Sequence, residues 1–183
     1  RKNSIIFLGN FNHTPNVDSL NYIIDDIWPK LESKCMINHN FIPTLEIIGS
    51  DMPIELKNKV KASKLNINNN GFIHNLSDIF SKSKLSIAPL RYGAGLKGKI
   101  ITSFENAVPA VGSKIAFEGI DTSNSFKDFK YSTENIDNFI LSVMRLLCDQ
   151  SLWESASEQA LQLVNKSYSL ESNIPKIKEI FYQ

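Results

Sequence analysis

The chain has 183 residues, of which 42% are hydrophobic, and a formal net charge of +1 at pH 7. This size and composition are typical of one globular domain with a sizeable core, and the small net charge excludes a general electrostatic attraction to nucleic acid. No apolar run approaches the roughly 20 residues of a membrane span, and the sequence shows neither a signal peptide nor a Cys/His spacing typical of metal ligands. We therefore expect a cytoplasmic protein with no metal, no nucleic-acid partner and no evident membrane association. The chain begins with Arg1 rather than Met, so we also expect a longer protein with a further domain upstream.

The first strand is predicted at residues 4–8, a continuous apolar run that ends at Gly9. After a polar loop, apolar residues at helical spacing predict a helix over residues 16–34. Pro29 lies inside this pattern and is expected to kink the helix or to end it early.

The second strand is predicted at residues 44–49, with the sequence TLEIIG. Residues 51–62 then predict a helix with Asp51 as its N-cap and Pro53 in its first turn. These two elements continue the alternation of strand and helix.

A short third strand is predicted near residues 65–67, and it runs into the polar sequence NNNG. A short helix follows at about residues 76–81, with Asn75 as its candidate cap. The fourth strand is predicted at residues 85–90, LSIAPL.

A glycine-rich loop at residues 90–98 follows the fourth strand, and the next helix is expected to begin near Lys97. Four apolar residues are expected to form the buried face of this helix, namely Ile100, Ile101, Phe104 and Ala107. Residues 108–113, VPAVGS, predict the fifth strand.

Two amphipathic helices close the chain at about residues 133–168, with Thr133 as the expected cap of the first. A short strand is expected before them, at residues 126–129. Pro175 argues against one continuous helix to the C-terminus.

The alternation of strands and helices predicts one domain over residues 1–183, with an α/β fold built on a doubly wound, Rossmann-like parallel sheet. Such sheets bind ligands beyond the carboxyl ends of their strands, where the strand order changes direction. The candidate site is therefore formed by the loops that follow strands, at residues 9–16, 49–52, 70–76, 90–98 and 112–120.

The loop at residues 90–98 carries the strongest functional signal. Its glycines allow backbone N–H groups to approach a ligand closely, and the N-terminus of the following helix attracts anions. Arg91 and Lys97 add full charges, and the guanidinium of Arg91 suits bidentate contact with a phosphate. These features favour a phosphate-binding loop over a mobile surface turn, although the spacing is neither that of a P-loop nor GxGxxG.

Two other loops carry candidate ligand-binding residues. Gly9, Asn10 and His13 follow the first strand, and His13 is suited either to donate to a ligand or to form hydrogen bonds within its own loop. Gly71 and Phe72 follow the third strand, where Phe72 either contacts a nucleobase or belongs to the core. The residues alone leave both alternatives open.

Three segments together resemble the C-terminal, donor-binding half of GT-B glycosyltransferases, most closely those called group 1 or family 4. The segments are FLGNFNHTPNVDSLNYIIDDIWPKL, GFIHNLSDIFSKSKLSIAPLRYGAGLKGKIITSF and VPAVGSKIAFEGI. The resemblance covers nearly the whole chain, and PLRYGAGLKGK is its most specific part. It implies a bacterial enzyme of polysaccharide or glycoconjugate biosynthesis that transfers a hexosyl group from a UDP-sugar or GDP-sugar, without a metal cofactor. It also implies an N-terminal domain, absent here, that holds the acceptor, so this fragment is expected to be inactive alone.

The resemblance also assigns roles to residues. It implies that Arg91 and Lys97 stabilise the departing diphosphate and that Gly71 and Phe72 border the base. Further donor contacts are expected from both sides of the cleft, at Gly9, Asn10, His13, Gly93, Ala94 and Gly95.

One departure from the family concerns the ribose. Many members place a glutamate in the helix after the glycine-rich loop, where it accepts from ribose hydroxyls, and the aligned residue here is Thr102. Two alternative functions fit the same architecture. One is a sugar-nucleotide epimerase, which would need carboxylates in the cleft, and the other is a non-catalytic domain that binds a phosphorylated ligand or a protein partner.

Overall fold

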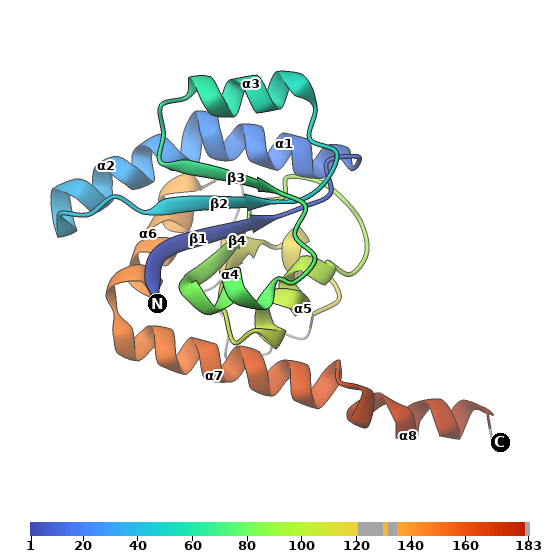
Figure 1. The fold of residues 1–183 in the computed structure, drawn as a ribbon. Coiled ribbons are helices and arrows are strands. Elements are labelled where there is room, and N and C mark those ends of the chain that lie inside the picture. Colours follow the sequence, from blue (N-terminus) through green and yellow to red (C-terminus); the bar gives the residue numbers. More distant parts are fainter. Residues whose placement is uncertain (121–129, 132–134, 182–183) are drawn as a thin grey trace.

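A six-stranded parallel sheet forms the centre of the molecule, with the strand order β3-β2-β1-β4-β5-β6 (Figure 1). The computed structural model describes residues 1–120, 130–131 and 135–181. The strands are β1 (Lys2–Leu8), β2 (Thr44–Ile48), β3 (Ile67–Gly71), β4 (Ser83–Ala88), β5 (Ala110–Ser113) and β6 (Lys130–Tyr131). Every neighbouring pair is parallel, which confirms the predicted doubly wound fold.

Helices cover both faces of the sheet (Figure 1). On one face lie α1 (Thr14–Tyr22), the π-helical segment η1 (Ile23–Ile27), α2 (Trp28–His39), α3 (Ile54–Ala62) and α6 (Ile136–Cys148). On the other lie α4 (Ser77–Lys82), α5 (Gly98–Glu105) and α7 (Gln150–Ser167). The short 3-10 helix η2 (Ile115–Phe117) follows β5, and α8 (Leu170–Phe181) continues from α7 away from the sheet. No helix in the described part of the chain is both long and apolar enough to cross a bilayer.

The apolar run of β1 is buried because it lies inside the sheet with helices on both sides. Ile5 and Phe7 belong to the main core, whereas Ile6 packs with Phe80 and Val108 on the α4 side. The alternation follows from the two-residue repeat of a strand. It explains why a strand between two layers of helices is apolar at consecutive positions.

Pro29 does not end the first helix, which continues in three segments from Thr14 to His39. In η1 the Trp28 N–H donates to the carbonyl of Ile23, five residues back. This wider π-helical turn shifts the hydrogen-bond register just before the proline. Pro29 then occupies the first turn of α2, where a helix needs no backbone N–H.

Two further predictions in the first half are corrected. The third strand covers Ile67–Gly71 rather than residues 65–67, because an edge strand does not need the apolar pattern of a buried one. Asp51 does not cap α3: it has a left-handed φ of 62°, and Pro53 holds the N-cap position. Leu76, rather than Asn75, holds the N-cap position of α4, and the Asn75 side chain accepts from the Ser77 N–H at 3.0 Å.

The C-terminal helices also differ in detail from the prediction. Asn135, rather than Thr133, caps α6 by accepting from the Asn138 N–H at 3.0 Å. Thr133 itself and the strand expected at residues 126–129 lie outside the described residues. The chain does contain two helices after residue 149, but the break falls at Tyr168, and Pro175 lies inside α8.

Gly49 sets a close approach of two chain segments at the ends of β1 and β2. Its N–H donates to the Gly71 carbonyl at 2.8 Å, and the Gly9 N–H donates to the Ile48 carbonyl at 3.0 Å. A Cβ atom on Gly49 would lie only 1.7 Å from the carbonyl oxygen of Gly9. The backbone would have to move to admit any side chain.

We therefore expect Gly49→Ala to lower the free energy of unfolding by about 3 kcal/mol or more, because it overpacks backbone against backbone. Gly98→Ala is the matched control, since no heavy atom lies within 4 Å of its added Cβ, and it should be neutral or slightly stabilising in a helix. Urea denaturation measures both changes. Equal stabilities of the two variants would contradict the expectation.

Candidate functional site

A pocket of about 350 Å³ opens at the carboxyl ends of β1 and β2, close to the point where the strand order reverses. We call it the strand-end pocket; its lining residues are Leu8, Gly9, Asn10, Asn16, Ile48, Gly49, Ser50, Phe72, Ile73, Leu76 and Lys99. The lining is mainly apolar with a few polar groups, which is typical of small-molecule sites. Its position is the one expected for a ligand of a doubly wound sheet.

Lys99 supplies the only formal charge among these lining residues. Its ammonium donates to Oδ1 of Asn16 and lies 5.2 Å from the centre of the Phe7 ring. Within the described residues, no carboxylate forms an ion pair with it. Burial, reinforced by the nearby charge of Lys97, lowers the pKa of Lys99 to about 8. The pocket therefore contains a half-buried, partly desolvated cation that an anion would stabilise.

The N-terminus of α5 adds to this positive character. Lys97 holds the N-cap position, and its side chain does not cap the helix. The first N–H groups of a helix have no partners within the helix, and they carry the positive end of its dipole. Because Lys99 is the second residue of α5, its ammonium and the positive end of the helix dipole both contribute positive charge near the pocket.

Asn16 links the loop after β1 to Lys99. Its Nδ2 donates to the Asn10 carbonyl at 2.6 Å, while its Oδ1 accepts from Lys99. Gly9 lies so close to this side chain that a Cβ on it would come within 2.9 Å of Asn16 Cγ. The loop is therefore compact, and it holds Asn16 between backbone and ammonium.

Arg91 and Lys97 do not line the strand-end pocket. Arg91 forms a bidentate ion pair with Asp18 of α1 and stacks over the Tyr22 ring at 5.0 Å. The hydrogen bonds that Arg91 donates to the Asp18 carboxylate raise the pKa of Arg91. Lys97 donates to the Gly95 carbonyl, and its Nζ lies 3.5 Å from Oε2 of Glu118. Both cations thus have partners within the protein.

The loop after β3 brings two of the predicted residues to the site. Phe72 lines the strand-end pocket and, with Gly71, a neighbouring hollow of about 410 Å³. Its side chain is 64% exposed and packs edge-on against His74, with ring centres 4.8 Å apart. Phe72 is therefore not a core residue.

The remaining predicted residues fall into two groups. Gly9 and Asn10 line the strand-end pocket, as the sequence suggested. The others do not line it: His13 is exposed at the N-cap position of α1, Thr102 is half-buried on α5, and the glycine-rich loop is exposed at Gly93, Ala94 and Gly95. Their roles in binding stay predictions.

Sequence reasoning placed Lys97 at the site and assigned no binding role to Lys99 or Asn16. The signal for Lys99 was present, since it is the first charged residue inside the helix after Gly98. Its contact with Asn16 joins residues 83 positions apart. Only the tertiary structure places those two side chains together.

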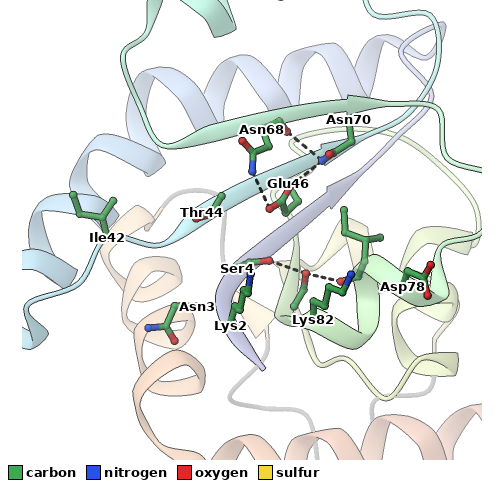
Figure 2. Close-up of a pocket in the computed structure, with 12 residues that line it drawn as sticks. Lys2, Asn3, Ser4, Ile42, Thr44, Glu46, Asn68, Asn70, Asp78 and Lys82 are labelled. Atoms are coloured by element: carbon green, nitrogen blue, oxygen red, sulfur yellow. Dashed lines mark hydrogen bonds between the residues drawn. The ribbon is translucent and has the colours of Figure 1, made fainter.

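A third hollow, of about 530 Å³, lies on the sheet face beside α4 (Figure 2). Glu46 projects from the middle strand of its floor and accepts from Nδ2 of Asn68 at 3.1 Å and of Asn70 at 2.8 Å (Figure 2). The Ser4 and Ser83 hydroxyls pair at 2.7 Å. These polar groups form hydrogen bonds with one another. The two lysines that line this hollow, Lys2 and Lys82, are exposed, whereas Lys99 is half-buried.

Residues 2–149 match the family model described as glycosyl transferases group 1. No curated protein sequence gives a significant match. A variant of S. aureus TarM, in complex with fondaparinux, alpha-GlcNAc-glycerol and UDP, has a similar fold, with a TM-score of 0.77 at 16% identity over 100% of this chain and 36% of that one. A glycosyltransferase from Rickettsia africae gives 0.73 at 16% identity, over 97% and 46%.

The pneumococcal O-GlcNAc transferase GtfA, in complex with UDP and GlcNAc, gives a TM-score of 0.65 at 15% identity, over 97% of this chain and 35% of that one. The chain thus spans between about a third and a half of the length of these proteins. At such low identities, the structural similarity shows the fold alone, which is that of one half of a GT-B protein. Because the family model covers most of the chain, the chain belongs to the glycosyl transferases of group 1.

Proposed function

We propose that this chain is the donor-binding domain of a glycosyltransferase that transfers a hexosyl group from a nucleoside diphosphate sugar. The observation that carries the proposal is the ammonium of Lys99, which lies in the strand-end pocket without a carboxylate partner among the described residues. Membership of the family supports the same reaction class. The lining of the pocket contains no carboxylate, so it gives no support to an epimerase.

The two parts of the pocket suit the two parts of a nucleotide. Ile48, Ile73 and Phe72 offer an apolar surface for the nucleoside. Lys99 and the N-terminus of α5 offer positive charge for the diphosphate. From there the phosphates would extend toward the glycine-rich loop, where Arg91 and Lys97 are the next cations.

Charge stabilisation is the proposed contribution of this domain to catalysis. When the bond between the sugar and the diphosphate breaks, negative charge develops on the leaving diphosphate. The positive charge of protonated Lys99, together with Lys97 and the α5 N-terminus, would stabilise that charge without a divalent metal. We propose that Thr102 takes the place of the ribose-binding carboxylate through its hydroxyl.

The acceptor would be bound by another part of the protein. The chain corresponds to between about a third and a half of the similar glycosyltransferases, so a second domain facing the strand ends would complete the cleft. On this proposal the isolated chain binds a donor and does not transfer its sugar.

Calorimetric titration with UDP, GDP and their sugars tests the donor site. We expect one of these nucleotides to bind, and Lys99→Met to weaken its binding at least about tenfold, because a charge-assisted contact is lost. Lys61→Met is the control, since Lys61 is exposed on α3 and does not line the pocket. Absence of binding by the wild-type chain at millimolar nucleotide, or equal binding by Lys99→Met, would refute the proposal. Binding that persists in excess EDTA would support its metal-free form.

The pKa of Lys99 makes the proposed binding pH-dependent. Lys99 is protonated below its pKa of about 8 and neutral above it in the free protein, whereas binding requires the charged form. Nucleotide affinity should therefore fall about tenfold between pH 7 and pH 9, as protonation becomes linked to binding. Titrations at several pH values measure this slope. The weak residual binding of Lys99→Met should lack this component of the pH dependence, and an identical slope in both proteins would contradict the assignment to Lys99.

A further inference from the structure

The C-terminal end of α7 is linked to the glycine-rich loop through a turn after η2. The Tyr168 hydroxyl donates to the carbonyl of Gly119 at 3.1 Å. Tyr168 is itself held at the end of α7, where its N–H donates to the Val164 carbonyl at 2.8 Å. The hydroxyl therefore reaches the turn from a fixed helix end.

The same turn contacts the last residues of the loop. A Cβ built on Gly119 would lie 3.6 Å from Cδ1 of Leu96, so Leu96 lies beside Gly119 with room for little more than one added methyl group. The neighbouring Glu118 places Oε2 3.5 Å from the Lys97 ammonium. Gly119 has a left-handed φ of 77°, which favours glycine at this position.

The glycine-rich loop depends on contacts with other segments because few contacts within the loop hold its conformation. Residues 91–96 are exposed, and Gly93 and Gly95 both have positive φ angles. Glycines leave a chain with many alternative conformations. Two contacts hold the loop at its ends, the Arg91–Asp18 ion pair and the contact of Leu96 and Lys97 with residues 118–119.

We propose that Tyr168 is a positioning residue of the donor site, which acts through Gly119 and Leu96 to hold the glycine-rich loop in its binding conformation. The inference rests on the proposed function, because it takes this loop to contact the diphosphate. A loop that is ordered before the ligand arrives loses less entropy on binding. The effect should therefore concern the phosphate part of the nucleotide and not the nucleoside.

Tyr168→Phe removes one hydroxyl and keeps the ring, and Leu96→Ala removes the packing against Gly119. Each should weaken UDP binding about two- to fivefold, which corresponds to one hydrogen bond or a small apolar contact. Uridine, measured by NMR titration, should bind with unchanged affinity. The double variant should lose less than the product of the two single effects, since both act through the same turn.

Leu141→Ala is the matched control for Leu96→Ala, because Leu141 lies on α6 and is 57% exposed against 53% for Leu96. It should leave UDP affinity unchanged, and thermal unfolding of each variant checks that the fold is retained. UDP affinities of both test variants within about 1.5-fold of wild type would overturn the proposal, as would equal losses for uridine and UDP.

The failures of the two proposals are distinguishable. If Lys99→Met weakens UDP binding and the two loop variants do not, the donor site stands and the positioning role of Tyr168 falls. If the wild-type chain binds neither UDP nor GDP, the donor site fails, and the positioning role fails with it. GDP and guanosine replace UDP and uridine if GDP is the nucleotide that binds.

Discussion

The reversal of strand order between β1 and β4 is the constraint on which the site depends. The chain leaves β1 toward β2 and leaves β4 toward β5, in opposite directions along the sheet. Because both crossovers keep the same hand, α1 and α5 lie on opposite faces while the loops leading to them emerge side by side. Asn16 and Lys99 therefore meet at the carboxyl ends of these central strands. The contact follows from topology and not from any local sequence preference.

The surroundings of Lys99 disfavour the charged form of its side chain. Burial disfavours its charge, Lys97 repels it, and the positive end of the α5 dipole lies beside it. The carbonyl oxygen of the Asn16 side chain and the face of the Phe7 ring offset part of this cost. Local preferences that conflict in this way are expected where a residue is kept for binding and not for stability.

The sequence predicted the fold class well because buried parallel strands and amphipathic helices have strong periodic signals. It was least reliable where burial does not determine the residue type, as in the polar edge strand β3, and where a rare geometry resolves a conflict, as at Pro29. At the site, the loops themselves were correctly expected to be at the strand ends. The directions of the side chains were not predictable, because they depend on contacts between distant residues. The ion pair between Arg91 and Asp18, for example, joins residues 73 positions apart.

The glycine-rich loop is held by segments from distant parts of the chain. Near its start, Arg91 is held by α1, and its end contacts a turn that Tyr168 holds from the C-terminal end of α7. The family match ends at residue 149, before α7 begins. The glycine-rich loop lies within the family match, but on our proposal one of its two supports comes from the end of a helix that the family model does not cover. The closing helices thus contribute to the order of the loop as well as to the packing of the sheet.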